Sequence, residues 1–191
     1  MMKTVLRAMQ KENTGAFNDV LPLFEDIVQN HVGSSSPQIG LDERCDHFAK
    51  AMKEHLTKEQ RYRIAEKHGT CNDTQYDKDR RAFAKEHVNT PIAERLEMFE
   101  DKFQRCTAVF NSADNTITVK FACSHGYYKK AYEGKFPPLP ESIEVYFERC
   151  AGGRLYEYQK ALGVKLKIKS VDVSPIYENP TNPVVFTFEI V

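Results

Sequence analysis

Residues 143–169, IEVYFERCAGGRLYEYQKALGVKLKIK, decide the fold of this 191-residue chain. From Ile143 to Leu162 the apolar side chains recur at helical spacing, and Gly163 follows as a residue that commonly ends a helix. Residues 164–169 then alternate between apolar side chains and lysines, which is typical of a strand with one exposed face. A helix that leads directly into a strand of this kind predicts a helix packed on a sheet.

Three further segments supply the rest of this sheet. Residues 107–111 and 116–122 are β-rich runs on either side of a turn, which predicts a hairpin. Residues 184–191 form another β-rich run, which we expect to pair with residues 164–169 in a second hairpin. Residues 106–191 therefore predict a β-β-α-β-β antiparallel sheet with one packed helix.

Residues 1–105 have the 3.6-residue period of helices. We expect about five helices here, with residues 3–12 forming a further short helix or an arm. The five expected segments are 16–29, 42–56, 58–68, 76–88 and 91–103. Thr57 and Gln60 have the spacing of a capping box at the start of one of them. The chain is thus predicted to be α+β, with a helical region 1–105 followed by an α+β region 106–191, and the two can form one compact unit.

The charge balance limits the classes of partner. The 27 basic residues equal the 27 acidic residues, which removes the electrostatic argument for binding nucleic acid or an anionic membrane. No segment approaches the ~20 apolar residues of a membrane span, and charges interrupt the apolar run that a signal peptide would need. The five cysteines are widely spaced and include no C-x-x-C pair. We expect a cytoplasmic protein, and a homo-oligomer is compatible with this composition.

Cys123-Ser124-His125 is the first candidate for chemistry. It follows a predicted strand, where residues two apart project to the same side. A thiolate and an imidazole placed in this way can bind one metal ion or form a nucleophile–base pair. The alternative is a half-buried cysteine beside a surface histidine.

Cys150-Ala151-Gly152-Gly153-Arg154 is the second candidate. If the helix breaks at the glycines, Cys150 lies near a helix N-terminus, where the dipole and Arg149 or Arg154 lower the pKa of its thiol. If the helix is continuous, Cys150 faces inward as inert packing. A glycine pair within a helix costs roughly 1 kcal/mol per residue, so either close packing or a break must account for it.

We predict no cofactor. The alternative is a zinc ion held by Cys71, Cys123, His125 and Cys150, which would join the helical region to the sheet. Tyrosines crowd the sequence around both thiol candidates, and such a cluster suits the wall of a small-molecule pocket as well as core packing. They are Tyr127, Tyr128, Tyr132, Tyr146, Tyr156 and Tyr158.

Residues 146–176 and 184–190 resemble the C-terminal part of an uncharacterised bacterial family. A Tyr-rich segment with a cysteine leads into a helix ending in A-L-G, and an F-x-F-x-I strand closes the pattern. The layout is similar to that of L-2-amino-thiazoline-4-carboxylate hydrolase-like proteins and, more distantly, of 4-vinyl reductase-type ligand-binding domains. The resemblance implies a small-ligand fold with Cys123, His125 and Cys150 at its site. Members usually carry a further cysteine where this chain has Pro183-Val184, which counts against a complete cysteine-based metal site.

Three functional hypotheses follow. The first is a small-molecule-binding protein with a pocket near Cys123, His125 and Cys150. Its further ligand contacts would be Tyr128, Tyr146, Arg149 and Arg154. The second is a hydrolase of a small, C–N-bonded, amino-acid-like substrate, with Cys123 or Cys150 as nucleophile, His125 as base and Arg154 anchoring a carboxylate. The third is a structural or regulatory protein whose helical region binds a partner.

Overall fold

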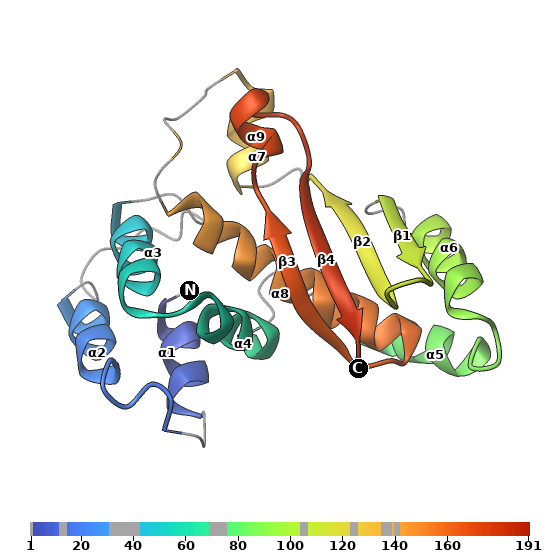
Figure 1. The fold of residues 1–191 in the computed structure, drawn as a ribbon, viewed down its shortest axis with the longest axis horizontal. Helices are drawn as coiled ribbons and strands as arrows, with labels where there is room; N and C mark the ends of the chain where they lie inside the picture. The colour runs from blue at the N-terminus through green and yellow to red at the C-terminus, as the bar shows by residue number, and fades with distance from the viewer. Residues whose placement is uncertain are drawn as a thin grey trace.

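The computed structural model describes residues 2–11, 15–30, 43–68, 76–103, 107–122, 126–134, 139 and 142–191. It confirms the α+β class. Helices come first in the chain, and a long helix then lies between two pairs of strands in the sequence and on one face of their sheet in space (Figure 1). In chain order the elements are α1 (Met2–Gln10), α2 (Leu21–Asn30), α3 (Glu43–His55), α4 (Lys58–His68), α5 (Asp77–Glu86), α6 (Ile92–Phe103), β1 (Thr107–Asn111), β2 (Thr116–Phe121), α7 (Gly126–Tyr132), α8 (Ile143–Leu162), β3 (Leu166–Asp172), α9 (Pro175–Glu178) and β4 (Val184–Ile190). The short helices α7 and α9 are additions to the predicted order.

The sheet is antiparallel throughout, with the strand order β1-β2-β4-β3. The two predicted hairpins are therefore confirmed, and β4 of the second hairpin pairs with β2 of the first. Phe121 of β2 pairs with Val184 of β4, and Ile168 of β3 pairs with Phe188 on the other side of β4. A bulge between Ile168 and Ser170 interrupts the register of β3.

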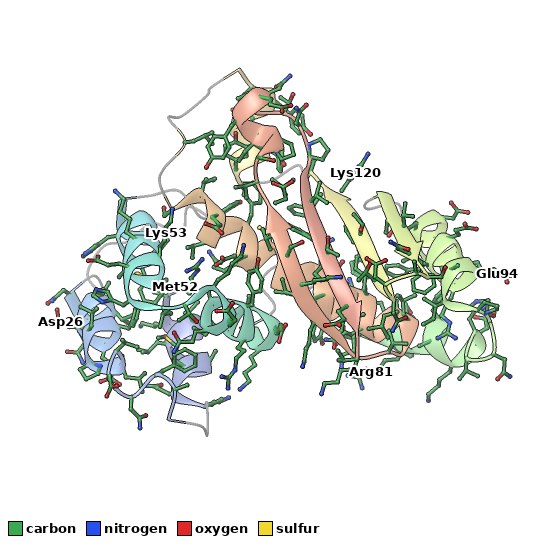
Figure 2. All side chains as sticks on the ribbon, in the orientation of Figure 1. Asp26, Met52, Lys53, Arg81, Glu94 and Lys120 are labelled. Carbon is green, nitrogen blue, oxygen red and sulfur yellow. The ribbon has the colours of Figure 1, made fainter. Side chains whose placement is uncertain are left out.

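Helix α8 covers one face of the sheet, and the strand sequences show why. Alternate residues of β2 and β4 are buried against the helix side, as Ile117 and Val119 are in β2 and Phe186 is in β4. The residues between them face outward, and Lys120 is an exposed example that Figure 2 labels. The prediction of one wet face is confirmed for β2 and for the lysine alternation of β3.

Two helix ends have the capping residues that the sequence predicts. The amide of Thr57 donates to Gln60 Oε1 at 2.8 Å, and the amide of Gln60 donates to Thr57 Oγ1 at 3.2 Å, which is a reciprocal capping box. Gly163 ends α8 with a left-handed φ of 65°, and its amide bonds to the carbonyl of Gln159. These contacts fix where α4 begins and where the chain turns from α8 into β3.

The helices preceding the sheet contribute to two apolar clusters. Helices α4, α5 and α6 bury Tyr62, Phe83 and Leu96 in the cluster that α8 forms with the sheet. Helices α1, α2 and α3 form a second cluster, which Ile64 of α4 and Val145 of α8 join. Helices α4 and α8 thus contribute side chains to both clusters, which connects the predicted helical region to the sheet.

Both edges of the sheet lie against helices, with α4 beside β3 and α6 beside β1 (Figure 1). At the β3 edge, side chains of α4 take the place of a further strand. The amide of Ile168 donates to Glu66 Oε1 at 2.7 Å, and the amide of Val171 donates to the Tyr62 hydroxyl at 3.0 Å. Such cover prevents an edge strand from pairing with another chain.

Candidate functional site

The predicted site residues divide into two groups. Cys71, Cys123 and His125 lie outside the described residues, so the Cys123–His125 pair stays a prediction. The remaining predicted residues lie on two adjoining elements. They are Tyr128 on α7 and Tyr146, Arg149, Cys150 and Arg154 on α8.

Cys150 lies in the middle of α8. The helix runs without a break through Gly152, so Cys150 is not at a helix N-terminus and gains no stabilisation of a thiolate from a helix dipole. Its side chain is 8% exposed and belongs to the apolar cluster of the sheet. Of the two alternatives, the continuous helix is correct, and close packing accounts for the glycine.

Five aromatic rings, two of them from α8 itself, pack together at the first turns of α8, and we refer to them as the aromatic cluster. They are Phe121, Tyr127, Tyr128, Tyr146 and Phe147. The Phe147 ring lies 5.7 Å from that of Tyr127, 5.8 Å from that of Tyr128 and 5.0 Å from that of Tyr146, between ring centroids. Most of these contacts are edge-to-face, the favoured arrangement of aromatic pairs.

The cluster adjoins both thiol candidates in the chain. Phe121 ends β2 and Tyr127 is the second residue of α7, so Cys123 and His125 lie between two residues of the cluster in the sequence. Cys150 follows Phe147 by three residues, which places it one helical turn along the same side of α8. Cys150 therefore lies beside the aromatic cluster, whereas Tyr156 and Tyr158 lie further along α8, where their hydroxyls donate to Asp77 and Glu100.

Tyr128 has a structural role at this place. Its hydroxyl donates to the carbonyl of Asn182 at 2.8 Å and accepts the amide of Val184 at 2.9 Å. The side chain is fully buried. Tyr128 therefore fastens α7 to the start of β4 and fixes the position of the neighbouring Tyr127.

Tyr127 differs from Tyr128. Its side chain is 1% exposed, and its hydroxyl has no hydrogen-bond partner among the described residues. Burial raises the pKa of this phenol, and the nearby hydroxyl of Tyr177 raises it further. At neutral pH Tyr127 is thus a protonated donor inside the protein, a type of group that is nearly always satisfied in folded proteins.

Arg154 is already engaged by a carboxylate. Its two terminal nitrogens lie 2.8 Å from the two oxygens of Glu157, and its guanidinium lies over the ring of Phe121 at 5.6 Å. Arg80 of α5 approaches the same Glu157 carboxylate at 3.1 Å. A substrate carboxylate at Arg154 would compete with Glu157 for this guanidinium.

A second buried ion pair was not predicted. Arg61 of α4 binds both oxygens of Glu148 on α8, with Nε and Nη2 each at 2.9 Å, and its Nη1 donates to the carbonyl of Leu56. Burial raises the pKa of Glu148, although the Arg61 hydrogen bonds oppose that shift. The glycine pair of α8 is the feature of the sequence that indicates this contact. Glycines within a helix allow a neighbouring element to pack closely on a face outside the apolar stripe, and a charged residue on that face is then buried.

No group of three or more His, Cys, Asp or Glu side chains in the described ranges could hold a metal ion. No helix in the described part of the chain is both long and apolar enough to cross a membrane. Comparison of the chain with protein-family models, with curated proteins and with solved structures found no match.

Proposed function

We propose that this protein binds a small molecule beside the aromatic cluster, where α7 meets the first turns of α8. The observation that carries this proposal is the Tyr127 hydroxyl, buried without a hydrogen-bond partner among the described residues. An unsatisfied buried donor costs about 1–3 kcal/mol. A bound acceptor atom would remove that cost.

The surroundings of Tyr127 support the same proposal. The aromatic cluster supplies the apolar surface that lines most small-molecule sites, in which a few polar groups fix the orientation of the ligand. The hydrogen bonds of Tyr128 to Asn182 and Val184 hold α7 in place. A donor on so constrained an element is preorganised for binding.

The other two hypotheses have less support from the described residues. As a nucleophile, Cys150 lacks the helix terminus that would activate its thiol, and Arg154 is paired with Glu157. A hydrolase that uses Cys123 and His125 stays a prediction, as does a protein-interaction role for the helical region. A cytoplasmic location also stays a prediction.

The test is a binding assay on the full chain with small aromatic probes. Ligand-observed NMR with benzamide, nicotinamide, benzoate and nicotinate would be run on the wild type and on Tyr127→Phe, which keeps the ring and removes the hydroxyl. We expect at least one probe to bind, and to bind about tenfold more weakly to the variant. Binding of no probe, or equal binding to both proteins, would contradict the proposal.

Tyr156→Phe is the matched control for this assay, because it removes a hydroxyl that lies outside the aromatic cluster and donates to Asp77. That hydroxyl is satisfied within the protein, so we expect a lower Tm but unchanged binding of the probes. Tyrosine fluorescence offers a second readout, because the chain has no tryptophan to which the tyrosines could transfer their excitation energy. A probe beside Tyr127 should quench that emission.

A further inference from the structure

We infer that the ligand of this site is an uncharged, planar molecule that presents one hydrogen-bond acceptor, such as an amide or ketone oxygen, to the Tyr127 hydroxyl. This inference rests on the proposed function and names the class of ligand. It follows from the chemistry of the donor, from the balance of buried charge and from the geometry of the rings.

The Tyr127 hydroxyl needs a hydrogen-bond acceptor on the ligand, and that acceptor can be uncharged. Tyr127 is 1% exposed, and burial raises the pKa of its phenol, so the group keeps its proton at neutral pH. A protonated phenol offers one O–H donor. A carbonyl oxygen or a ring nitrogen satisfies this donor without bringing a charge into an apolar region.

The buried charges around Arg154 are already balanced. Arg154, whose guanidinium lies over Phe121, is neutralised by Glu157, which also pairs with Arg80. Asp77 accepts from Arg80 at 3.4 Å, so the two buried guanidinium groups of this network face two carboxylates, and the exposed Arg81 also lies 4.0 Å from Asp77. A buried anion needs a cation of its own to offset its desolvation. An anionic ligand held by Arg154 would have to break its bidentate pair with Glu157, whereas a neutral ligand leaves that pair intact.

The rings favour a flat ligand. Tyr127 meets Phe147 and Tyr128 at interplanar angles of 79° each, so rings in this cluster present edges to the faces of others. A planar molecule can continue such edge-to-face packing with little rearrangement. Because Tyr127 is almost fully buried, entry requires side chains to move, and a small ligand displaces fewer of them.

The experiment compares matched pairs of probes that differ in charge. Nicotinamide and nicotinate, and benzamide and benzoate, have nearly the same shape at pH 7.5, but the second member of each pair is an anion. Dissociation constants would be measured on the wild-type full chain by NMR titration. We expect each neutral probe to bind at least tenfold more tightly than its anionic partner, and Tyr127→Phe to weaken the binding of the neutral probes about tenfold.

Arg149→Gln tests whether the site instead binds an anionic ligand. Arg149 is half-buried on α8 and is a ligand contact predicted from the sequence, so it is the cation that such a ligand would use. If the anions bind as tightly as the amides or more tightly, and Arg149→Gln abolishes that binding, the ligand class is wrong but the binding site stands. If no probe binds the wild type, both the inference and the proposed function fail. The comparison within each pair is made on the wild type, so it does not depend on a variant that folds.

Discussion

Gly152 of α8 lies directly against the backbone of Ala65 on α4. A Cβ atom added at position 152 would meet the carbonyl oxygen of Ala65 at 2.1 Å and its carbonyl carbon at 2.6 Å. Separations of this kind are far inside van der Waals contact, so only glycine fits between the two helices. This contact accounts for a glycine in the middle of the longest helix, where it costs roughly 1 kcal/mol of helix propensity.

Gly152→Ala is expected to destabilise the protein by about 2 kcal/mol or more, because the clash outweighs the gain in helix propensity. The free energy of unfolding in urea would measure this change. Ala65→Gly in the same molecule should give no rescue, since the clashing atoms belong to the backbone of residue 65. A Gly152→Ala protein as stable as the wild type would show that the helices are further apart.

Glu148→Gln should cost about 3 kcal/mol, because the buried guanidinium of Arg61 loses its bidentate carboxylate and keeps only Glu144, 3.9 Å away. The double variant Arg61→Met with Glu148→Leu removes both charges and should recover most of that loss. Lys169→Gln is the exposed control. Its pair with Asp114 spans 3.7 Å with both side chains about half exposed, so its removal should change the stability by no more than about 0.5 kcal/mol. Equal losses for Glu148→Gln and Lys169→Gln would contradict the prediction.

Tyr128→Phe should lower the free energy of unfolding by about 1–3 kcal/mol, since the amide of Val184 and the carbonyl of Asn182 both lose a partner. Tyr127→Phe should be neutral or slightly stabilising in the absence of ligand, because no described group depends on its hydroxyl. Thermal unfolding of the two variants side by side tests this contrast. A larger loss for Tyr127→Phe than for Tyr128→Phe would mean that the Tyr127 hydroxyl supports the fold.

Glu66 should make the stability depend on pH. Burial raises its pKa above the usual value of 4.5, although the amide of Ile168 donates a hydrogen bond to it. Above pH 4.5 the folded protein therefore binds more protons than the unfolded chain, and its stability falls as the pH rises. The stabilisation from protonated Glu66 is fully present below that pH and is lost as the pH rises through the pKa of Glu66 in the folded protein. Glu66→Gln stays neutral and should show a smaller loss over that window in urea unfolding. Parallel pH profiles for the two proteins would contradict this assignment.

The sequence predicts most of the fold because its local signals agree with one another. The alternation of β2 and β3, the capping box at Thr57 and the end of α8 at Gly163 each correspond to a feature of the structure. Helices α7 and α9 were missed because they are short, and α7 presents no clear apolar stripe. The position of β4 between β2 and β3 depends on contacts distant in the chain, which no local pattern encodes.

The site was less predictable. Residue type alone singled out Arg154 as a carboxylate anchor, but its pairing with Glu157 depends on how α8 is buried. Tyr127 appeared only as one of several tyrosines, and it differs from Tyr128 through the partners of its hydroxyl. Partner geometry of this kind exists only in the folded chain. The Cys123–His125 pair stays a prediction on the sequence pattern.

The central place of β4 also sets an order of assembly. The hairpin of β1 and β2 needs only neighbouring residues and can form early. The hairpin of β3 and β4 is likewise local, but the pairing of Phe121 with Val184 that joins the two hairpins must close a loop that contains the whole of α8. Completion of the sheet is therefore a late and slow event, and until it occurs the apolar face of α8 has no sheet to cover it.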